Sequence, residues 1–324
     1  MPRFLLRRAI NYVVLCLIAV FLTFTLASLT FDPIGVLRHR QPPPPAATLA
    51  DKIDQLHLDQ PIPQRFLTWL AGIPHGNFGV SVAGDPIGPD VLPRAMISLR
   101  LFLAGTIIGV LLAVIVGVAG AVRQYRFTDY ATAIGSYILI AAPVFVIGGL
   151  LKYGAVQVNL ATGSDFLQTD LEVTPGFSGG LGAELVDRFR HLILPTLAIA
   201  LPMAAQYSRY QRNAMLDVLG ADFLRTARAK GLRRGKVLVR HGLRTALIPM
   251  STLFAWAFGT MLVGGPFTEH IFDWHGMGAW LIDGIDTQDA NVTTTVTLFV
   301  AGCVLASGLL ADLAYAALDP RVRI

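Results

Sequence analysis

Long apolar stretches alternate with polar segments along the whole chain, and this alternation predicts a polytopic membrane protein. A helix that crosses the hydrocarbon core of a bilayer needs about 20 predominantly apolar residues. Six stretches approach or exceed that length, so we expect an all-α fold with six transmembrane helices. The stretches cover residues 9–31, 101–122, 131–151, 192–208, 245–268 and 290–311.

Prolines interrupt several of these stretches. The stretch 192–208 is short for a span and contains Pro195 and Pro202, while Pro143 predicts a kink in the stretch before it. Such breaks are tolerated in a membrane where the freed backbone groups face protein or water. We therefore expect residues 192–208 to line a cavity.

The polar segments divide the chain into three predicted parts. Residues 1–31 hold a cytoplasmic N-terminus and the first span, and residues 32–96 form a small external segment between the first two spans. Residues 97–324 form the core, with five spans and a cytoplasmic loop at 208–249. A further polar segment, 152–190, is expected outside.

The external segment has its own local pattern. Four consecutive prolines at 42–45 predict an extended, stiff polyproline spacer. Apolar residues at helical spacing predict two short helices, at 47–58 and 61–70. We assign no chemistry to this segment.

The distribution of charge orients the spans. Basic residues near span ends are retained in the cytoplasm, and here they occupy the segments expected inside, whereas most acids occupy the segments expected outside. Both termini are therefore predicted to be cytoplasmic. In the segments expected inside, the bases other than those of the long loop are Arg3, Arg7, Arg8, Arg123, Arg126, Arg321 and Arg323.

Composition agrees with this class. The chain of 324 residues is 54% hydrophobic and only 15% charged, whereas a soluble domain carries roughly a quarter of charged residues. The net charge of +5 comes chiefly from the predicted internal loops and does not suggest nucleic acid as a partner. Cys16 and Cys303 both lie in apolar stretches, which predicts buried small side chains and no disulfide framework.

The loop 208–249 carries a large excess of positive charge, with ten bases facing only Asp217 and Asp222. The bases are Arg209, Arg212, Arg225, Arg228, Lys230, Arg233, Arg234, Lys236, Arg240 and Arg244. Apolar residues from Met215 onward recur at helical spacing, Gly220 predicts a break, and Asp222 is a candidate N-cap of a new helix. Gly231 is expected to end that helix. The pattern predicts a short docking helix presented to a cytoplasmic partner.

Two runs in this loop resemble a known family. Residues 222–232, DFLRTARAKGL, and residues 240–249, RHGLRTALIP, look like the ATPase-coupling loop of peptide/nickel-type ABC importer permeases. Arg225-Thr226-Ala227 stands where the general form of this loop has Glu-Ala-Ala, and the distance from Gly231 to Pro249 is longer than in sugar permeases. Both departures are typical of the peptide branch. The residues expected in the coupling helix are Asp222, Phe223, Arg225, Thr226, Ala227, Arg228, Ala229, Lys230, Gly231 and Leu232.

The resemblance implies a fold, a set of partners and a mechanism. The fold is that of a type I ABC importer permease (MetI-like), most similar to the B-type subunit of oligopeptide and dipeptide systems of the bacterial cytoplasmic membrane. The implied partners are a homologous second permease, two ATPase subunits or domains, and an external substrate-binding protein. ATP and magnesium would be bound by the ATPases, and this chain would carry no cofactor, metal or catalytic residue. Nickel and glutathione importers belong to the same branch, so nickel and glutathione are alternative substrates to peptides.

The basic loop also has a structural alternative. It could act only as a topology signal that rests on anionic headgroups. The small side chains from Thr226 to Gly231 favour docking, because they let the groove of another protein close tightly over a helix.

Residues 231–237 are superficially similar to a phosphate loop, but the first glycine is one residue too close and Val237 replaces the magnesium-binding Ser or Thr. We therefore reject a nucleotide-binding loop at these residues.

Two other clusters invite a functional interpretation. The run 269–276 contains Glu269, His270, Asp273 and His275, a weak metal constellation because it lacks regular helical ligand spacing. We favour an external hairpin whose tryptophans, Trp274 and Trp280, lie at the membrane interface. Asp312, after the last span, can reach water or pair with Arg321.

Rival functional classes lack their expected residues. No predicted span has a charged residue in its middle, which argues against a proton-coupled carrier. A channel would need a selectivity ring, and an intramembrane enzyme would need paired acids, histidine clusters or a nucleophile with its base inside the spans. We see none of these patterns in the sequence.

Overall fold

The structure, a computed structural model, describes residues 2–38 and 44–318. Within these ranges every regular element is a helix, apart from an isolated β-bridge between Val80 and Pro86. The longer helices are α1 (Pro2–Thr30), α5 (Gly88–Val122), α6 (Phe127–Ala141), α7 (Val144–Thr162), α8 (Leu181–Leu219), α11 (Arg244–Gly264) and α14 (Ala290–Leu318). The shorter ones are α2 (Pro33–Arg38), α3 (Ala46–Gln55), α4 (Ile62–Gly72), η1 (Ile73–His75), α9 (Asp222–Ala229), α10 (Arg234–Val237), η2 (Leu238–Leu243), α12 (Pro266–Ile271) and α13 (Met277–Asp286).

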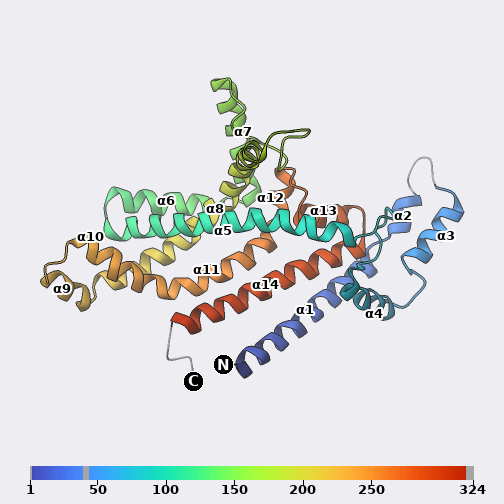
Figure 1. The fold of residues 1–324 in the computed structure, drawn as a ribbon, viewed down its shortest axis with the longest axis horizontal. Coiled ribbons are helices and arrows are strands. Elements are labelled where there is room, and N and C mark those ends of the chain that lie inside the picture. The colour runs from blue at the N-terminus through green and yellow to red at the C-terminus, as the bar shows by residue number, and fades with distance from the viewer. Residues whose placement is uncertain (1, 39–43, 319–324) are drawn as a thin grey trace.

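Helices α5 and α8 form the centre of the bundle and run parallel to each other (Figure 1). Glycines of α5 face α8 in register: a Cβ atom at Gly105 would lie 2.7 Å from Ile199, and one at Gly109 would lie 2.8 Å from Met203. Small residues at such a crossing let two helix backbones approach closely. The parallel arrangement means that α6 and α7 together return the chain to the side where α5 began.

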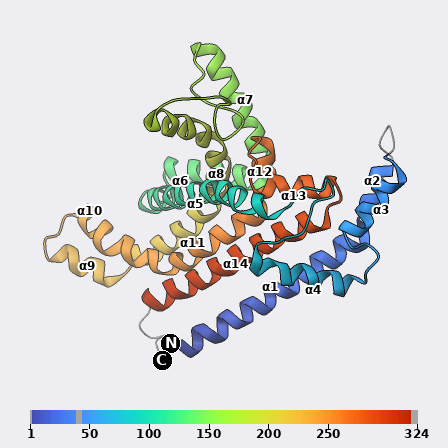
Figure 2. The ribbon, with the colours of Figure 1, turned by 45° about the vertical axis from the view of Figure 1, so that its right-hand side comes forward.

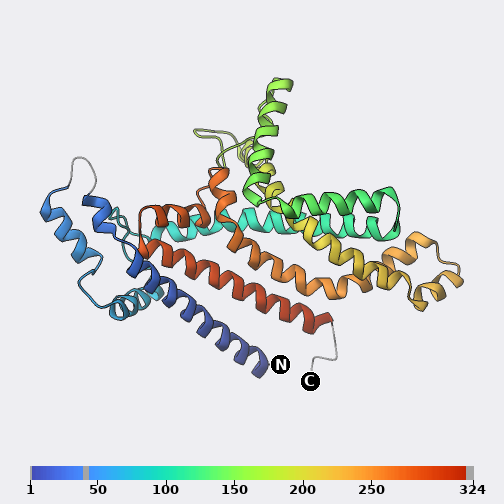
Figure 3. The same ribbon diagram turned by 180° about the vertical axis from the view of Figure 1, so that it is seen from behind.

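The first and last long helices lie side by side and antiparallel (Figure 3). The Nε of Arg8 lies 2.5 Å from Oδ2 of Asp312, and the Tyr12 hydroxyl donates to the same carboxylate oxygen at 3.3 Å. Asp312 was expected to meet water or Arg321. Arg321 is outside the described residues, and the described partners of Asp312 are Arg8 and Tyr12 of α1.

Four described helices are long and apolar enough to cross a membrane: Arg7–Thr30, Gly88–Val122, Val144–Thr162 and Ala290–Leu313. The predicted third span, 131–151, is not one kinked helix. It is divided between α6, with 15 residues, and α7, which points away from the bundle (Figure 2). Pro143 explains the break, because a residue before proline avoids helical geometry, and Ala142 has φ −82° and ψ 130°.

Other predicted boundaries also differ from the observed ends of the helices. The short stretch 192–208 is the middle of α8, whose 39 residues extend into the polar segments predicted on both sides of the span. Helix α5 begins at Gly88, inside the predicted external segment 32–96. The predicted fifth span divides at Pro266 into α11 and α12.

The segment between α1 and α5 packs in two apolar clusters, one of which includes residues of α1. The two predicted short helices are confirmed as α3 and α4. In α4, Phe66 and Trp69 stack on each other and pack against Phe24 of α1. Pro45 has the polyproline angles φ −56° and ψ 148°, whereas Pro42 and Pro43 lie outside the described residues.

Candidate docking surface and a buried carboxylate

The basic loop forms a protrusion at one end of the bundle, made of the end of α8 followed by α9, α10 and η2 (Figure 1). The predicted break at Gly220 is confirmed, since α8 ends at Leu219 and α9 begins two residues after Gly220. Gly231 has φ +81°, a left-handed conformation that glycine adopts easily, and it follows the helix as expected. The sequence thus located this helix correctly.

Helix α9 has one buried anchor and a broad exposed face. Leu224 is 2% exposed and approaches Gly242 of η2 together with Met215 of α8. Leu224 was not among the predicted docking residues, which all remain at least partly accessible, and Phe223 is 44% exposed. Asp222, Arg225, Thr226, Arg228, Ala229, Lys230 and Gly231 are exposed, and Ala227 and Leu232 are half-buried.

Asp222 does not cap the helix as we expected. It is the first residue of α9, Ala221 occupies the N-cap position, and no side chain makes a capping hydrogen bond there. The Asp222 carboxylate instead lies 3.6 Å from Arg225, where both side chains are exposed. A negative charge in the first turn still interacts favourably with the helix dipole.

Two of the ten loop bases contact α6 of the bundle: Arg212 is partly buried there, whereas Arg209 is exposed. Arg212 makes a bidentate ion pair with Asp129, at 2.6 and 2.8 Å, and Arg209 lies 4.5 Å from the centre of the Tyr137 ring. The bases from Arg225 to Lys230, by contrast, project from the protrusion. A cavity of about 470 Å³ lies between α9, α10 and the end of α5, lined by Val122, Leu224 and Leu238 among others.

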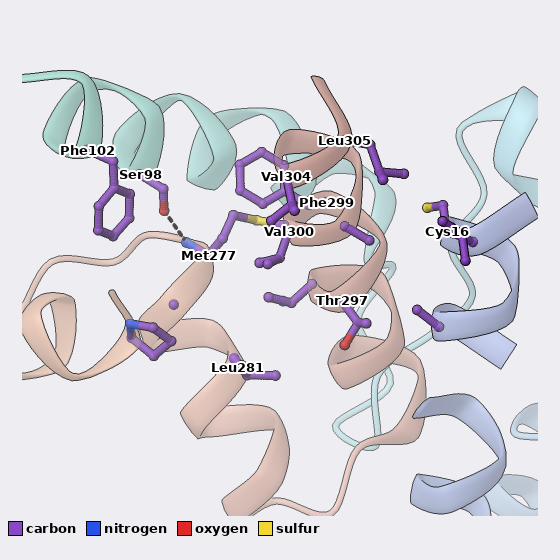
Figure 4. Close-up of a pocket in the computed structure, with 16 residues that line it drawn as sticks. Cys16, Ser98, Phe102, Met277, Leu281, Thr297, Phe299, Val300, Val304 and Leu305 are labelled. Atoms are coloured by element: carbon purple, nitrogen blue, oxygen red, sulfur yellow. Dashed lines mark hydrogen bonds between the residues drawn. The ribbon is translucent and has the colours of Figure 1, made fainter. Parts of the chain in front are cut away.

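The run 269–276, whose residue types suggested a metal site, contains a buried, hydrogen-bonded carboxylate. Glu269, on α12, has no exposed surface. Its Oε1 accepts a hydrogen bond from Ser98 Oγ of α5 at 2.5 Å, and its Oε2 accepts from the backbone N–H groups of Gly278 and Ala279 at 2.8 and 3.1 Å. Figure 4 shows Ser98 accepting in turn from the backbone of Met277, at 2.8 Å. The carboxylate therefore caps the N-terminus of α13 and ties it to α5.

This arrangement explains the glycines that follow Glu269. A Cβ atom at Gly276 would lie 2.5 Å from both Glu269 Oε2 and Ser98 Oγ, and one at Gly278 would lie 2.6 Å from Pro266 Cα. Burial raises the pKa of Glu269 to about 7, against the opposing hydrogen bonds from Ser98 and the backbone. Sequence reasoning missed this site, although two glycines so soon after an acid do signal close approach of the backbone.

The predicted interface tryptophans are buried within the chain. Trp274 is 3% exposed and packs in the core with Phe102 and Phe272, and Trp280 is 8% exposed beneath Arg94. Neither indole is available to a lipid headgroup, so that prediction was wrong. Among the described residues, no group of three or more His, Cys, Asp and Glu side chains is placed to hold a metal.

Ser98, the hydrogen-bond partner of Glu269, lines an apolar cavity of about 390 Å³ (Figure 4). The cavity lies between α1, α5, α13 and α14, and its walls include Cys16, Phe102, Met277 and Val300. Cys16 and Cys303 are both free and half-buried, rather than fully buried as expected.

The matching family defines the class of this protein. Residues 105–324 match the family described as "Binding-protein-dependent transport system inner membrane component", and residues 1–85 match the one described as "Binding-prot-dependent transport system membrane comp, N-term". The chain belongs to this family of membrane permease components, which confirms the resemblance of its basic loop.

Relatives match across nearly the whole chain. It is 48% identical over 324 residues to the "Oligopeptide transport system permease protein OppB" of Mycobacterium tuberculosis, with 100% of both chains covered. It is 32% identical over 332 residues to the "Oligopeptide transport system permease protein AppB" of Bacillus subtilis, with 99% of each chain covered. It is 34% identical over 289 residues to the "Dipeptide transport system permease protein DppB" of Escherichia coli, with 85% of each chain covered.

Proposed function

We propose that this chain is a permease subunit of an ATP-driven, binding-protein-dependent importer of oligopeptides or dipeptides. The observation that carries the proposal is the exposed helix α9 on a bundle of apolar helices, within a chain similar from end to end to permeases named for peptide transport. The chain contributes no covalent chemistry. It forms half of the pathway, a homologous second permease forms the other half, and two ATPase subunits supply the energy.

Alternating access is the proposed mechanism. ATP closes the ATPase dimer, the docked helices at residues 222–231 move together, and the spans rock so that the pathway opens outside. ATP hydrolysis and product release then reset the permeases. The residues that would meet the ATPase are the exposed ones of α9 together with Gly231 and Leu232.

The proposed topology has six spans in a bacterial cytoplasmic membrane, with both termini in the cytoplasm. In this scheme α6 and α7 together take the place of the third span, since α6 alone is too short to cross a bilayer. The parallel directions of α5 and α8 support this return of the chain. The segment between α1 and α5 would then lie outside, where the substrate-binding protein arrives.

The substrate class rests on the relatives, whose printed names concern peptides. Nickel and glutathione remain alternative cargoes of the same machinery, because specificity resides largely in the external binding protein. Direct binding measurements on that partner, with a peptide pool, glutathione and Ni²⁺ offered in parallel, would distinguish the three. Peptide binding is the expected result.

Transport itself is tested in liposomes that contain the complete complex. We expect peptide uptake that requires ATP, and we expect it to stop when the ATPase subunits carry a substitution that prevents hydrolysis. Uptake driven by a proton gradient in the absence of ATP would contradict the importer and favour a carrier. Passive equilibration without ATP would instead favour a channel.

A further inference from the structure

A buried ion pair joins the start of α6 to the C-terminal part of α8. Arg212 Nε donates to Asp129 Oδ1 at 2.6 Å, and Nη2 donates to Oδ2 at 2.8 Å. The side chain of Asp129 is 6% exposed and that of Arg212 is 26% exposed. A bidentate pair of this kind fixes the orientation of both side chains as well as their distance.

The surrounding backbone holds Asp129 in place. The backbone N–H of Tyr125, whose φ is +61°, donates to Asp129 Oδ2 at 2.9 Å. The hydrogen bond from Arg212 is the main cause that lowers the pKa of Asp129, so the carboxylate stays ionised at neutral pH. Asp129 thus connects the α5–α6 turn, the start of α6 and α8.

Close packing of α5 on α8 leaves little freedom at this junction. A Cβ atom at Gly117 would lie 2.6 Å from the backbone oxygen of Ser208, and one at Gly120 would lie 3.3 Å from Asp129 Oδ1 and 3.4 Å from Arg212 Cδ. On the side of the ion pair away from α9, Ser136 of α6 and Ser208 of α8 lie 3.4 Å apart. The three helices therefore meet at one polar, tightly packed level of the bundle.

The junction lies on the path from the docking helix to the rest of the bundle. Helix α8 is continuous from Arg212 to Leu219, and only Gly220 and Ala221 separate it from α9. On the other side, α6 leads through the break at Pro143 to α7, where a Cβ atom at Gly148 would lie 3.4 Å from the Phe272 ring beyond α12. The pair therefore lies where a displacement of α9 that moves the end of α8 would reach α6.

We propose that Asp129 and Arg212 are positioning residues for transport: their ion pair makes α6 follow α8 when the docking helix moves. This inference rests on the proposed function, because it requires an ATPase that displaces α9. It assigns to Arg212 a role different from that of the exposed bases of the same loop. Those bases face a partner, whereas Arg212 faces the bundle.

The alternative is a brace that matters only for folding, and a measurement of coupling separates the two. The test uses the complete complex in liposomes, with a radiolabelled tetrapeptide pool as the probe. Three variants are compared with wild type: Asp129→Asn, Arg212→Lys, and the exchanged double variant Asp129→Arg with Arg212→Asp. Assembly with the ATPase, ATPase activity without peptide, and peptide transported per ATP hydrolysed are measured for each.

We expect Asp129→Asn to assemble and to hydrolyse ATP while peptide transported per ATP falls about tenfold, within the usual range of coupling between two sites. Arg212→Lys keeps the charge without the bidentate geometry and is expected to give an intermediate ratio. The exchanged variant is expected to recover part of the loss. A matched control is Arg100→Gln, which removes the exposed 2.7 Å pair of α5 with Glu172 and should leave the ratio unchanged.

Several outcomes overturn the inference. One is a wild-type ratio in assembled Asp129→Asn, and a second is an equal loss of transport and ATPase activity in all variants. A third is failure of assembly even in Arg212→Lys, which assigns the pair to folding alone. If the wild-type complex itself shows no ATP-driven uptake, the proposed function fails instead, and the two failures are distinguishable.

Discussion

The hydroxyl of Ser98 and the carboxylate of Glu269 are 2.5 Å apart, although 171 residues separate them in sequence. Ser98 lies on α5 and Glu269 on α12, and both also bind the backbone at the start of α13. A single buried carboxylate therefore sets the relative positions of three helices. Its partner Ser98 lines an apolar cavity that also contacts α1 and α14 (Figure 4).

The first prediction concerns the shape and polarity of Glu269. Glu269→Ala leaves Ser98 and two buried backbone N–H groups without an acceptor, at a cost of about 1–3 kcal/mol for each group left unsatisfied. Glu269→Gln keeps an oxygen that accepts from the two N–H groups, and its amide nitrogen can donate to the Ser98 oxygen. Thermal unfolding of the purified protein in detergent should show a large loss for the alanine variant and a small one for the glutamine variant. Equal losses would mean that these hydrogen bonds do not hold the hairpin.

The second prediction concerns pH. Burial raises the pKa of Glu269 from its ordinary value of 4.5 to about 7, so the folded state binds the proton more tightly than the unfolded state does. The stabilising contribution is therefore complete below about pH 4.5 and is lost as the pH rises through about 7. Unfolding temperatures measured from about pH 5 to about pH 8 should fall more steeply in wild type than in Glu269→Gln. Parallel curves for the two proteins would contradict this assignment.

The third prediction concerns the contact of α11 and α12 with α5. A Cβ atom at Gly265 would lie 1.9 Å from Phe102 Cζ, and the Phe102 ring is only 1% exposed. Gly265→Ala should therefore destabilise the protein by about 1–3 kcal/mol or more through overpacking. Gly149→Ala on α7 is the control, because no atom lies within 4 Å of its added methyl group. Alanine favours a helix interior over glycine, so the control should unfold no earlier than wild type.

The fourth prediction concerns the docking surface. Ala227 is half-buried on α9, and Ala227→Trp adds a large side chain to the docking helix without the backbone strain that a substitution at Gly231 adds. We expect membrane insertion to be unchanged and peptide-stimulated ATPase activity of the complex to fall at least about tenfold. Gly231→Leu should have the same effect, whereas Leu67→Trp on α4, at the opposite end of the bundle, should not. Normal stimulation in Ala227→Trp would discredit docking at this helix.

Local patterns explain what the sequence could predict. Apolar runs located α1 and α14, helical spacing located α3 and α4, and Gly231 marked the end of the basic helix. Each of these elements is determined by neighbours within a few residues. Pro143 also marked a real interruption, but the direction of α7 after it depends on packing against α8 and α12, which no local pattern contains.

Long-range partners explain what the sequence could not predict. Arg212 was counted among the ten bases of the loop 208–249 because its partner, Asp129, lies 83 residues earlier. Glu269 was read beside its neighbours His270 and Asp273, whereas its contacts come from α5 and from the start of α13. Trp274 and Trp280 were placed at a membrane interface by residue type, and the fold buries both.

The most direct test of docking is photo-crosslinking from α9 in the assembled complex. A photoreactive amino acid replaces the exposed Thr226, and a second version carries it at Leu67 of α4, which is 63% exposed at the opposite end of the bundle. We predict a covalent adduct between position 226 and a nucleotide-hydrolysing subunit, and no such adduct from position 67. An intact complex in which position 226 never captures that subunit, or in which position 67 does, would contradict the account.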